Sequence, residues 1–167
     1  MKLLTNNNGE IEEVAPITQS TGASDASKAV QTDASGKLDA SLLPTGIGAD
    51  VVAIQASEAL AAGDLVNIYN NAGIPSVRKA IATGPGTKAH GYVIAGVASG
   101  ALANVYFDDS NNQVSGLTAG EQFLSATQAG KTTGAAPTAA GQIVQKVGVA
   151  TSATTLHVNV GPAIKLA

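Results

Sequence analysis

Cysteine and tryptophan are absent from this chain of 167 residues, and other aromatic residues are scarce. The lack of cysteine excludes disulfide bonds, thiolate metal sites and a cysteine nucleophile. The five aromatic residues all lie after position 68, so the segment 1–48 has few large side chains with which to build a core. A core of Ala, Val, Leu and Ile buries less apolar area per residue than one with rings. We therefore expect association with copies of the chain or with a larger body to support the fold.

Clustered positive charge is also missing. The formal net charge is −3, with seven acids and three lysines in residues 1–50 and five acids and six bases in residues 51–167. Nucleic-acid binding requires a basic face, which this distribution does not provide. No apolar run approaches the length of a membrane span, and residues 1–4 are too short for the apolar part of a signal peptide. The sequence thus predicts a soluble protein that binds neither nucleic acid nor membrane and is used without Sec-type export.

A weak internal repeat organises the second half of the chain. The string LAAGD at residues 60–64 returns as LTAGE at residues 117–121. The pair Ala72-Gly73 returns with the same spacing as Ala129-Gly130, and the string GVA at residues 96–98 returns at residues 148–150. Internal symmetry of this size indicates a duplicated small β unit.

Short apolar runs separated by Gly-rich turns follow residue 50. The last of them alternates, with Leu156, Val158 and Val160 on one face of the expected strand. Short strands at close spacing predict an all-β fold, a small barrel or sandwich. We expect one β domain over residues 49–167, built from two similar halves at about 60–107 and 117–160.

Residues 1–48 are predicted to be an extended polar arm and linker. In residues 1–15, two strand-like runs flank Asn8-Gly9, a pair that suits a turn with positive φ, so a hairpin and a solvated tail both fit. Residues 17–48 are small and polar, and such a composition buries too little apolar area to offset its chain entropy.

The few large apolar residues of the arm are grouped near its end, where we expect partner contacts. They are Leu38, Leu42, Leu43, Pro44 and Ile47. Two interpretations stay open: the arm lies along a partner through these anchors, or Leu42 and Leu43 pack onto the chain's own barrel.

No motif predicts catalysis, a metal or a cofactor. Gly130-Lys131-Thr132 imitates a phosphate-binding loop, but Ser125 stands where the earlier Gly is needed and no helix can follow. The two histidines, His90 and His157, have no acidic cluster near them in sequence. The adjacent acids Asp108-Asp109 are expected at a hairpin tip and lack the spacing of a calcium site.

Several stretches nevertheless resemble parts of known proteins. Residues 33–44, DASGKLDASLLP, resemble a linker common in structural proteins of tailed bacteriophages. Residues 60–66 and 91–98 look like the Ala-Gly-Asp-x-Val and Gly-Val-Ala pattern of phage capsid decoration (cement) proteins. Residues 117–120 with residues 141–150 resemble a β module shared by decoration proteins and phage fibres.

The resemblance implies a virion structural protein, made in the host cytoplasm, that binds the outer surface of a phage head. Its partner would be the major capsid protein, its own state a homo-trimer, and it would have no cofactor, active site or small-molecule substrate. The long arm and the repeat also allow a head-fibre, tail-fibre or tail-tip module. A carbohydrate-binding β module is a further alternative, although sugars stack on exposed aromatic rings that this chain has few of. A small hydrolase has no motif behind it.

Overall fold

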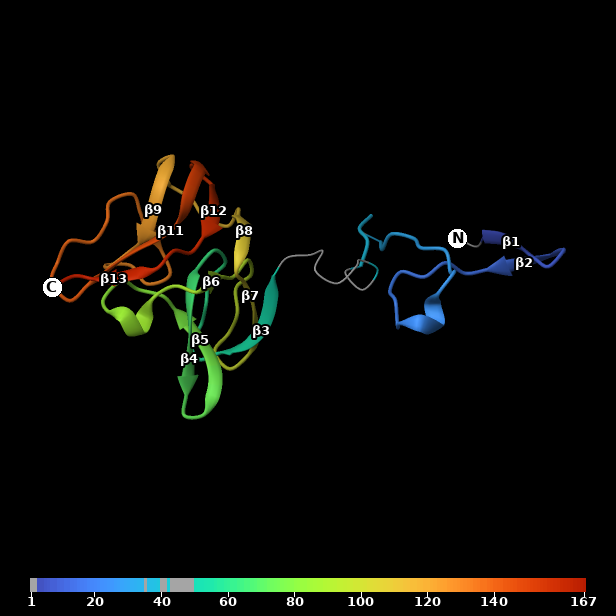
Figure 1. Ribbon diagram of the computed structural model, residues 1–167, viewed down its shortest axis with the longest axis horizontal. Coiled ribbons are helices and arrows are strands. Elements are labelled where there is room, and N and C mark those ends of the chain that lie inside the picture. Colours follow the sequence, from blue (N-terminus) through green and yellow to red (C-terminus); the bar gives the residue numbers. More distant parts are fainter. Residues whose placement is uncertain (1–2, 35, 40–41, 43–49) are drawn as a thin grey trace. The chain divides into compact units, whose positions relative to one another are not determined.

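Strands make up nearly all the regular structure, as the short apolar runs predict. The computed structural model describes residues 3–34, 36–39, 42 and 50–167. Internal contacts divide the chain into two compact units, Met1–Gly48 and Ala49–Ala167 (Figure 1). The all-β class is confirmed, and the second unit contains a closed five-stranded barrel and a further sheet.

The first unit begins with a hairpin, one of the two interpretations that the sequence left open for residues 1–15. Strands β1 (Leu3–Asn7) and β2 (Glu10–Val14) pair antiparallel across a turn in which Asn8 and Gly9 have φ of 55° and 99°. Positive φ at both turn positions matches the right-handed twist of the two strands. The Asn6 side-chain carbonyl accepts a 2.8 Å hydrogen bond from the Gly9 N–H and closes the turn.

After the hairpin, the chain of the first unit folds back on itself. Ile17 and Val30 form an isolated parallel bridge on either side of the 3₁₀ turn η1 (Ala23–Asp25). Asp25 accepts hydrogen bonds from the backbone N–H and hydroxyl of Thr21 and pairs with Lys28 at 2.7 Å. The Lys28 ammonium and the Thr21 donors lower the pKa of Asp25 to about 2. Polar side chains, rather than an apolar core, therefore hold this loop.

The second unit opens with the barrel. Its strands are β3 (Val51–Ala56), β4 (Leu65–Asn71), β5 (Ile74–Lys79), β6 (Gly91–Tyr92) and β7 (Leu102–Tyr106). They close in the order β3-β5-β4-β6-β7, and the short 3₁₀ turn η3 (Pro85–Thr87) lies between β5 and β6. One short parallel ladder between β3 and β5 closes the barrel, with Gln55 opposite Ser76 and Ala56 opposite Val77. The other strand pairs of the barrel are antiparallel.

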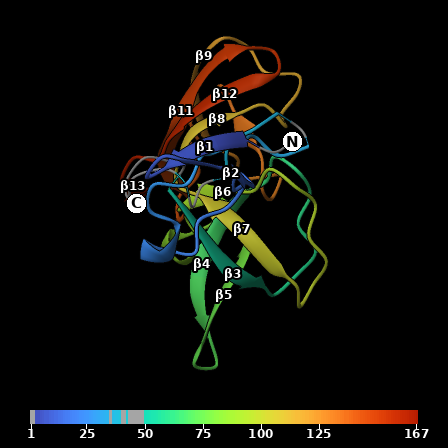
Figure 2. The same ribbon diagram turned by 90° about the vertical axis from the view of Figure 1, so that its right-hand side faces the viewer.

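A second, open sheet follows the barrel. Its strands are β8 (Asp108–Asn111), β9 (Gly120–Leu124), β10 (Thr132–Thr133), β11 (Ile143–Ser152), β12 (Thr155–Asn159) and β13 (Ala163–Lys165). The order is β10-β9-β11-β12-β8, and β13 pairs with the first residues of β11. Figure 2 shows the same unit from the side of β3 and β7.

The two sheets share one strand order. Read from its second hairpin strand, the barrel runs β5-β4-β6-β7-β3, and the open sheet runs β10-β9-β11-β12-β8 in the same pattern. β3 begins at Val51 and β8 at Asp108, the same separation as that between Leu60 and Leu117 in the sequence repeat. This order supports the predicted duplication and extends the second copy back to β8. The copies differ in closure, since β3 pairs with β5 whereas no ladder among the described strands joins β8 to β10.

The Gly-Val-Ala match, by contrast, does not mark equivalent positions. Leu65 pairs with Tyr92, and its repeat counterpart Gln122 pairs with Gly148. Gly148 therefore takes the place of Tyr92 in the ladder rather than that of Gly96, which lies after β6. Pairing with neighbouring strands, not local similarity, sets the register. The apolar run over residues 91–97 contributes only the two-residue strand Gly91–Tyr92 and an isolated bridge from Val97 to Leu60.

The expected hairpin tip at Asp108-Asp109 is also wrong. Both residues belong to β8, which pairs with β12 at the edge of the open sheet. The strand is irregular: Asp109 has φ of 94°, and its N–H donates to the Asp108 carboxylate at 2.8 Å. Pairing with β12 overrides the local turn preference of the two acids.

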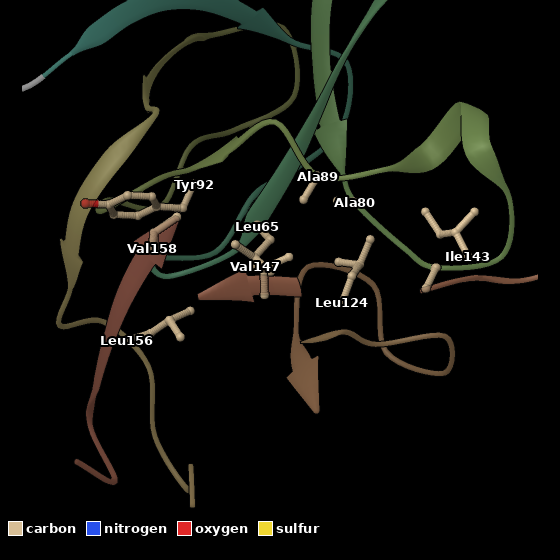
Figure 3. Packing of buried hydrophobic residues seen from close by; sticks show 10 residues of the cluster. Leu65, Ala80, Ala89, Tyr92, Leu124, Ile143, Val147, Leu156 and Val158 are labelled. Carbon is tan, nitrogen blue, oxygen red and sulfur yellow. The ribbon is translucent and has the colours of Figure 1, made fainter. Parts of the chain in front are cut away.

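Neighbouring residues of the barrel strands belong to two different cores. Val66 and Val93 lie inside the barrel with Ala56, Val77, Ala103 and Val105. Leu65 and Tyr92 instead face the open sheet and pack with Leu124, Ile143, Val147, Leu156 and Val158 (Figure 3). Strand alternation sends successive side chains to opposite faces, so β4 and the segment at β6 serve both cores.

A buried carboxylate joins the two halves. The Asp64 side chain is 1% exposed and lies 2.6 Å from the Lys131 ammonium and 3.9 Å from that of Lys79. Asp64 Oδ1 is the oxygen nearest Lys131, and Oδ2 accepts a hydrogen bond from the Ala61 N–H at 2.9 Å. The Gly130 Cα lies so close that an added Cβ would stand 2.8 Å from the carboxylate carbon. The Gly-Lys string that imitated a phosphate loop thus holds an internal ion pair.

We predict that Asp64→Ala lowers the free energy of unfolding by about 1–3 kcal/mol, because it leaves the Ala61 N–H without its acceptor and removes the ion pair of a buried carboxylate. Urea denaturation measures the change. The matched control is Glu121→Ala at the corresponding repeat position, where the 2.7 Å pair with Lys146 is exposed and contributes under about 1 kcal/mol. Equal losses in the two variants would contradict the structural role of Asp64.

We further predict that Gly91→Ala destabilises the barrel by about 1–3 kcal/mol, because its Cβ would overlap the backbone carbonyl of Tyr106 and β6 would have to shift. Gly86→Ala is the control, since a Cβ there meets no atom within 4 Å. Thermal unfolding of both variants gives the comparison. A Gly91→Ala melting temperature equal to that of wild type would show that β6 and β7 do not approach so closely.

Candidate interaction surface

The predicted contact residues of the arm fall partly within the described chain. Leu38 is 52% exposed, and Leu42 is half-buried with its N–H donating to the Asp39 carbonyl at 3.0 Å. Leu43, Pro44 and Ile47 lie outside the described residues. The described part of the predicted site therefore presents one clearly exposed leucine and one partly covered leucine.

A closed turn directly precedes Leu38. The Asp33 N–H donates to the Lys37 carbonyl at 2.8 Å, and the Asp33 carboxylate accepts the Lys37 N–H at 2.9 Å. Gly36, with φ of 77°, supplies the left-handed conformation that the turn requires. Directly after Leu38, the Asp39 carboxylate accepts a 3.1 Å hydrogen bond from the Gln19 side-chain amide. Leu38 is thus placed between two hydrogen-bonded anchors rather than on an unstructured chain.

Other aliphatic side chains of the first unit are exposed as well. Leu4 is 75% exposed, Ile11 67% and Val30 50%. None of these residues belongs to either described core cluster. The described residues of this unit form no apolar core cluster, so its exposed aliphatic side chains are the feature that contact with another surface would cover.

The second unit carries an uncharged surface that sequence reasoning missed. We call it the β3–β7 face, and it comprises Val51, Ala53, Gln55, Leu102, Asn104 and Tyr106, which pair across the two strands. Beside it, a groove of about 290 Å³ is lined by Ile94, Ala95, Gly96, Val97, Leu102, Asn104 and Tyr106. Leu102 is 70% exposed and Ile94 41%. The signal in the sequence was the run of residues 91–107, which contains no charged residue.

A more polar cavity of about 460 Å³ lies where the barrel meets the open sheet. It is lined in part by Asp50, Lys88, His90, Asp108 and Gln145. The buried Gln145 amide accepts the Ala89 N–H at 2.8 Å and donates to the carbonyls of Ala89 and Gly161. These contacts tie β11 to the loop before β6, so Gln145 serves the fold.

His90 has a comparable structural role. Its Nδ1 accepts the Ile68 N–H at 2.9 Å, which fixes a neutral ring with the proton on Nε2. Burial, and then the Lys88 charge, lower the pKa of His90 below its ordinary value of 6.5. His157 lies exposed on β12. Among the described residues, no three His, Cys, Asp or Glu side chains are grouped so that they could hold a metal ion.

Comparisons with known proteins add no relative. The chain matches no protein-family model, no curated protein and no solved structure. Within the described residues, no helix is both long and apolar enough to cross a membrane. The resemblance to phage decoration proteins therefore depends on the sequence motifs alone.

We predict that stability falls between pH 7.5 and 5.5 because of His90. Its folded pKa is lowered, so below 6.5 the unfolded chain takes up a proton that the folded ring resists. The contribution is thus present above pH 6.5 and lost as the pH falls. In His90→Asn, the amide oxygen can accept the Ile68 N–H without titrating. The variant should therefore lose less stability than wild type between pH 7.5 and 5.5.

Urea denaturation at the two pH values measures the effect, with His157→Asn as the control because that ring is exposed. The control should keep the wild-type pH dependence. A His90→Asn protein that loses as much stability as wild type would rule out His90 as the source.

Proposed function

We propose that this chain is a virion structural protein that binds the outer surface of a phage head as a homo-trimer and stabilises it by bridging major capsid subunits. The observation that supports the proposal best is the division into two units, each with exposed aliphatic side chains. Residues 33–44, which resemble a phage structural linker, lie at the end of the first unit. A bridging protein needs at least two such contact regions on one chain.

The physical basis is the addition of several modest contacts. An aliphatic side chain such as Leu38 contributes about 1.5–3 kcal/mol when fully buried against a partner. One such contact gives weak binding, but a second contact on the same chain then forms at a high effective concentration. A protein that binds two neighbouring capsid subunits lowers the free energy of the assembled shell relative to separated subunits, and so resists the outward pressure of packaged DNA.

The β domain suits a scaffold that presents such contacts. Its two cores are composed of residues after position 50, and the buried polar groups Asp64 and Gln145 are engaged inside the domain. Among the described residues, the members of both core clusters all belong to the second unit. Contact regions can therefore act without disturbing the packing that holds the domain together.

A carbohydrate-binding module is less well supported by the side chains. Sugars stack on exposed aromatic rings, whereas all five aromatic residues here are buried or half-buried. The Tyr69 ring is moreover covered by the Arg78 guanidinium, 4.1 Å from its centre. A head-fibre, tail-fibre or tail-tip module shares the same sequence resemblance and is the alternative. The structure to which the chain binds, the head surface or the tail, distinguishes the two.

We predict that deleting residues 1–48 weakens binding to phage heads by about tenfold or more while the β domain stays folded. The deletion removes one of two contact regions, and about 1.4 kcal/mol of lost contact corresponds to a factor of ten. Co-sedimentation with purified heads measures binding, and thermal unfolding measures the fold. Leu38→Ser should reproduce part of the loss.

Ile164→Ser provides the control, because it removes an aliphatic side chain that is 63% exposed on β13, outside the first unit. Unchanged affinity of the truncated protein would end the proposal that the arm binds the capsid. A large drop in melting temperature would instead assign Leu42 and Leu43 to the chain's own barrel. Binding to tails and not to heads would favour the fibre alternative.

A further inference from the structure

The β3–β7 face has an unusual composition for an exposed surface. No charged residue occurs in residues 51–57 or 91–107, which supply the face and the adjoining groove. Figure 2 shows β3 and β7 side by side, and the register places Gln55 opposite Leu102 and Ala53 opposite Asn104. Most surfaces of soluble proteins intersperse charges, so a charge-free face with an exposed leucine indicates an interaction site.

The same face carries both a projection and a recess. Leu102 is the most exposed large aliphatic side chain of the second unit. The recess beside it is the groove of about 290 Å³, whose lining includes Ile94, Val97 and Tyr106. A surface that presents an apolar side chain next to an apolar groove can complement a second copy of itself.

We propose that the β3–β7 face is the contact between copies of this chain, with Leu102 of one copy seated in the groove of its neighbour. The inference deepens the proposed function, because it rests on the self-association in that proposal and names its surface. The neighbour meets the face without placing like charges together and without leaving an ion unpaired. Because the face itself has no charged residue, two copies can meet there without complementary charges, even though each copy carries a net charge of −3.

The small side chains of the barrel supply a reason for the association. Alanine contributes Ala56 and Ala103 to the barrel interior, which therefore buries little area per residue. Apolar surface removed from water between copies adds to the stability of each copy, since oligomerisation stabilises the folded state by mass action.

The test is sedimentation velocity of the full chain over a range of micromolar concentrations. Leu102→Asp should weaken self-association by about tenfold or more, because it brings a charge into the apolar contact. Ile74→Asp is the matched control, since Ile74 is 55% exposed at the start of β5 and should leave association unchanged. A monomeric wild type, or a Leu102→Asp protein that associates like wild type, would overturn the inference.

Head binding by the same variants separates this inference from the proposed function. If Leu102→Asp associates normally but no longer binds heads, the face belongs to the capsid contact and the inference is overturned. If wild-type protein associates through Leu102 yet binds no heads, the inference holds and the proposed function fails.

Disulfide trapping tests the contact directly, because the chain has no cysteine of its own. A Leu102→Cys protein is mixed with a size-tagged Ile94→Cys protein under mild oxidation. We expect a mixed disulfide dimer on a non-reducing gel. The control replaces the second protein with Ile74→Cys, and equal yields from the two mixtures would contradict the assigned groove.

Discussion

The second unit depends on strands that are covered on both sides by apolar cores. In β4, Leu65 packs between the barrel and the open sheet while Val66 fills the barrel, and Tyr92 and Val93 divide in the same way. Since the barrel interior is made largely of Ala and Val, one covered face buries little area. The open sheet supplies the second covered face. The duplicated unit is thus more than a repetition, because each half completes the burial of the other.

Polar side chains then fix how the halves meet. Asp64 of the barrel pairs with Lys131 of the open sheet at 2.6 Å, and the Asn111 amide donates to the Gly63 carbonyl at 3.1 Å. Among the described residues, every buried side-chain nitrogen and oxygen has a hydrogen-bond partner. Buried polar groups with all partners present specify one arrangement, because any other packing would leave them unsatisfied. This requirement explains why polar residues persist in a core with few large side chains.

This division of roles leaves the outer surfaces available for binding. The first unit is held by turns and by the Asp25–Lys28 pair, and its Leu4 and Leu38 are exposed. The second unit is held by its two cores and presents the β3–β7 face. In the proposed virion protein, the first unit would contact the capsid and the β3–β7 face would contact other copies. Each surface could then change without cost to the cores.

Elements with a local cause could be predicted from the amino-acid order. Alternation and Gly-rich turns predicted an all-β domain, and the return of LAAGD as LTAGE predicted two similar halves. The pair Asn8-Gly9 allowed the hairpin but did not decide between it and a solvated tail. Barrel closure through Gln55 and Ser76, the strand at Asp108, and the ion pair between Asp64 and Lys131 became visible only in three dimensions. Of the candidate surface, the sequence singled out Leu38, whereas Leu102 emerged only when β7 was placed beside β3. Local pattern sets which residues form strands, while pairing and burial between distant segments decide which side chains remain at the surface.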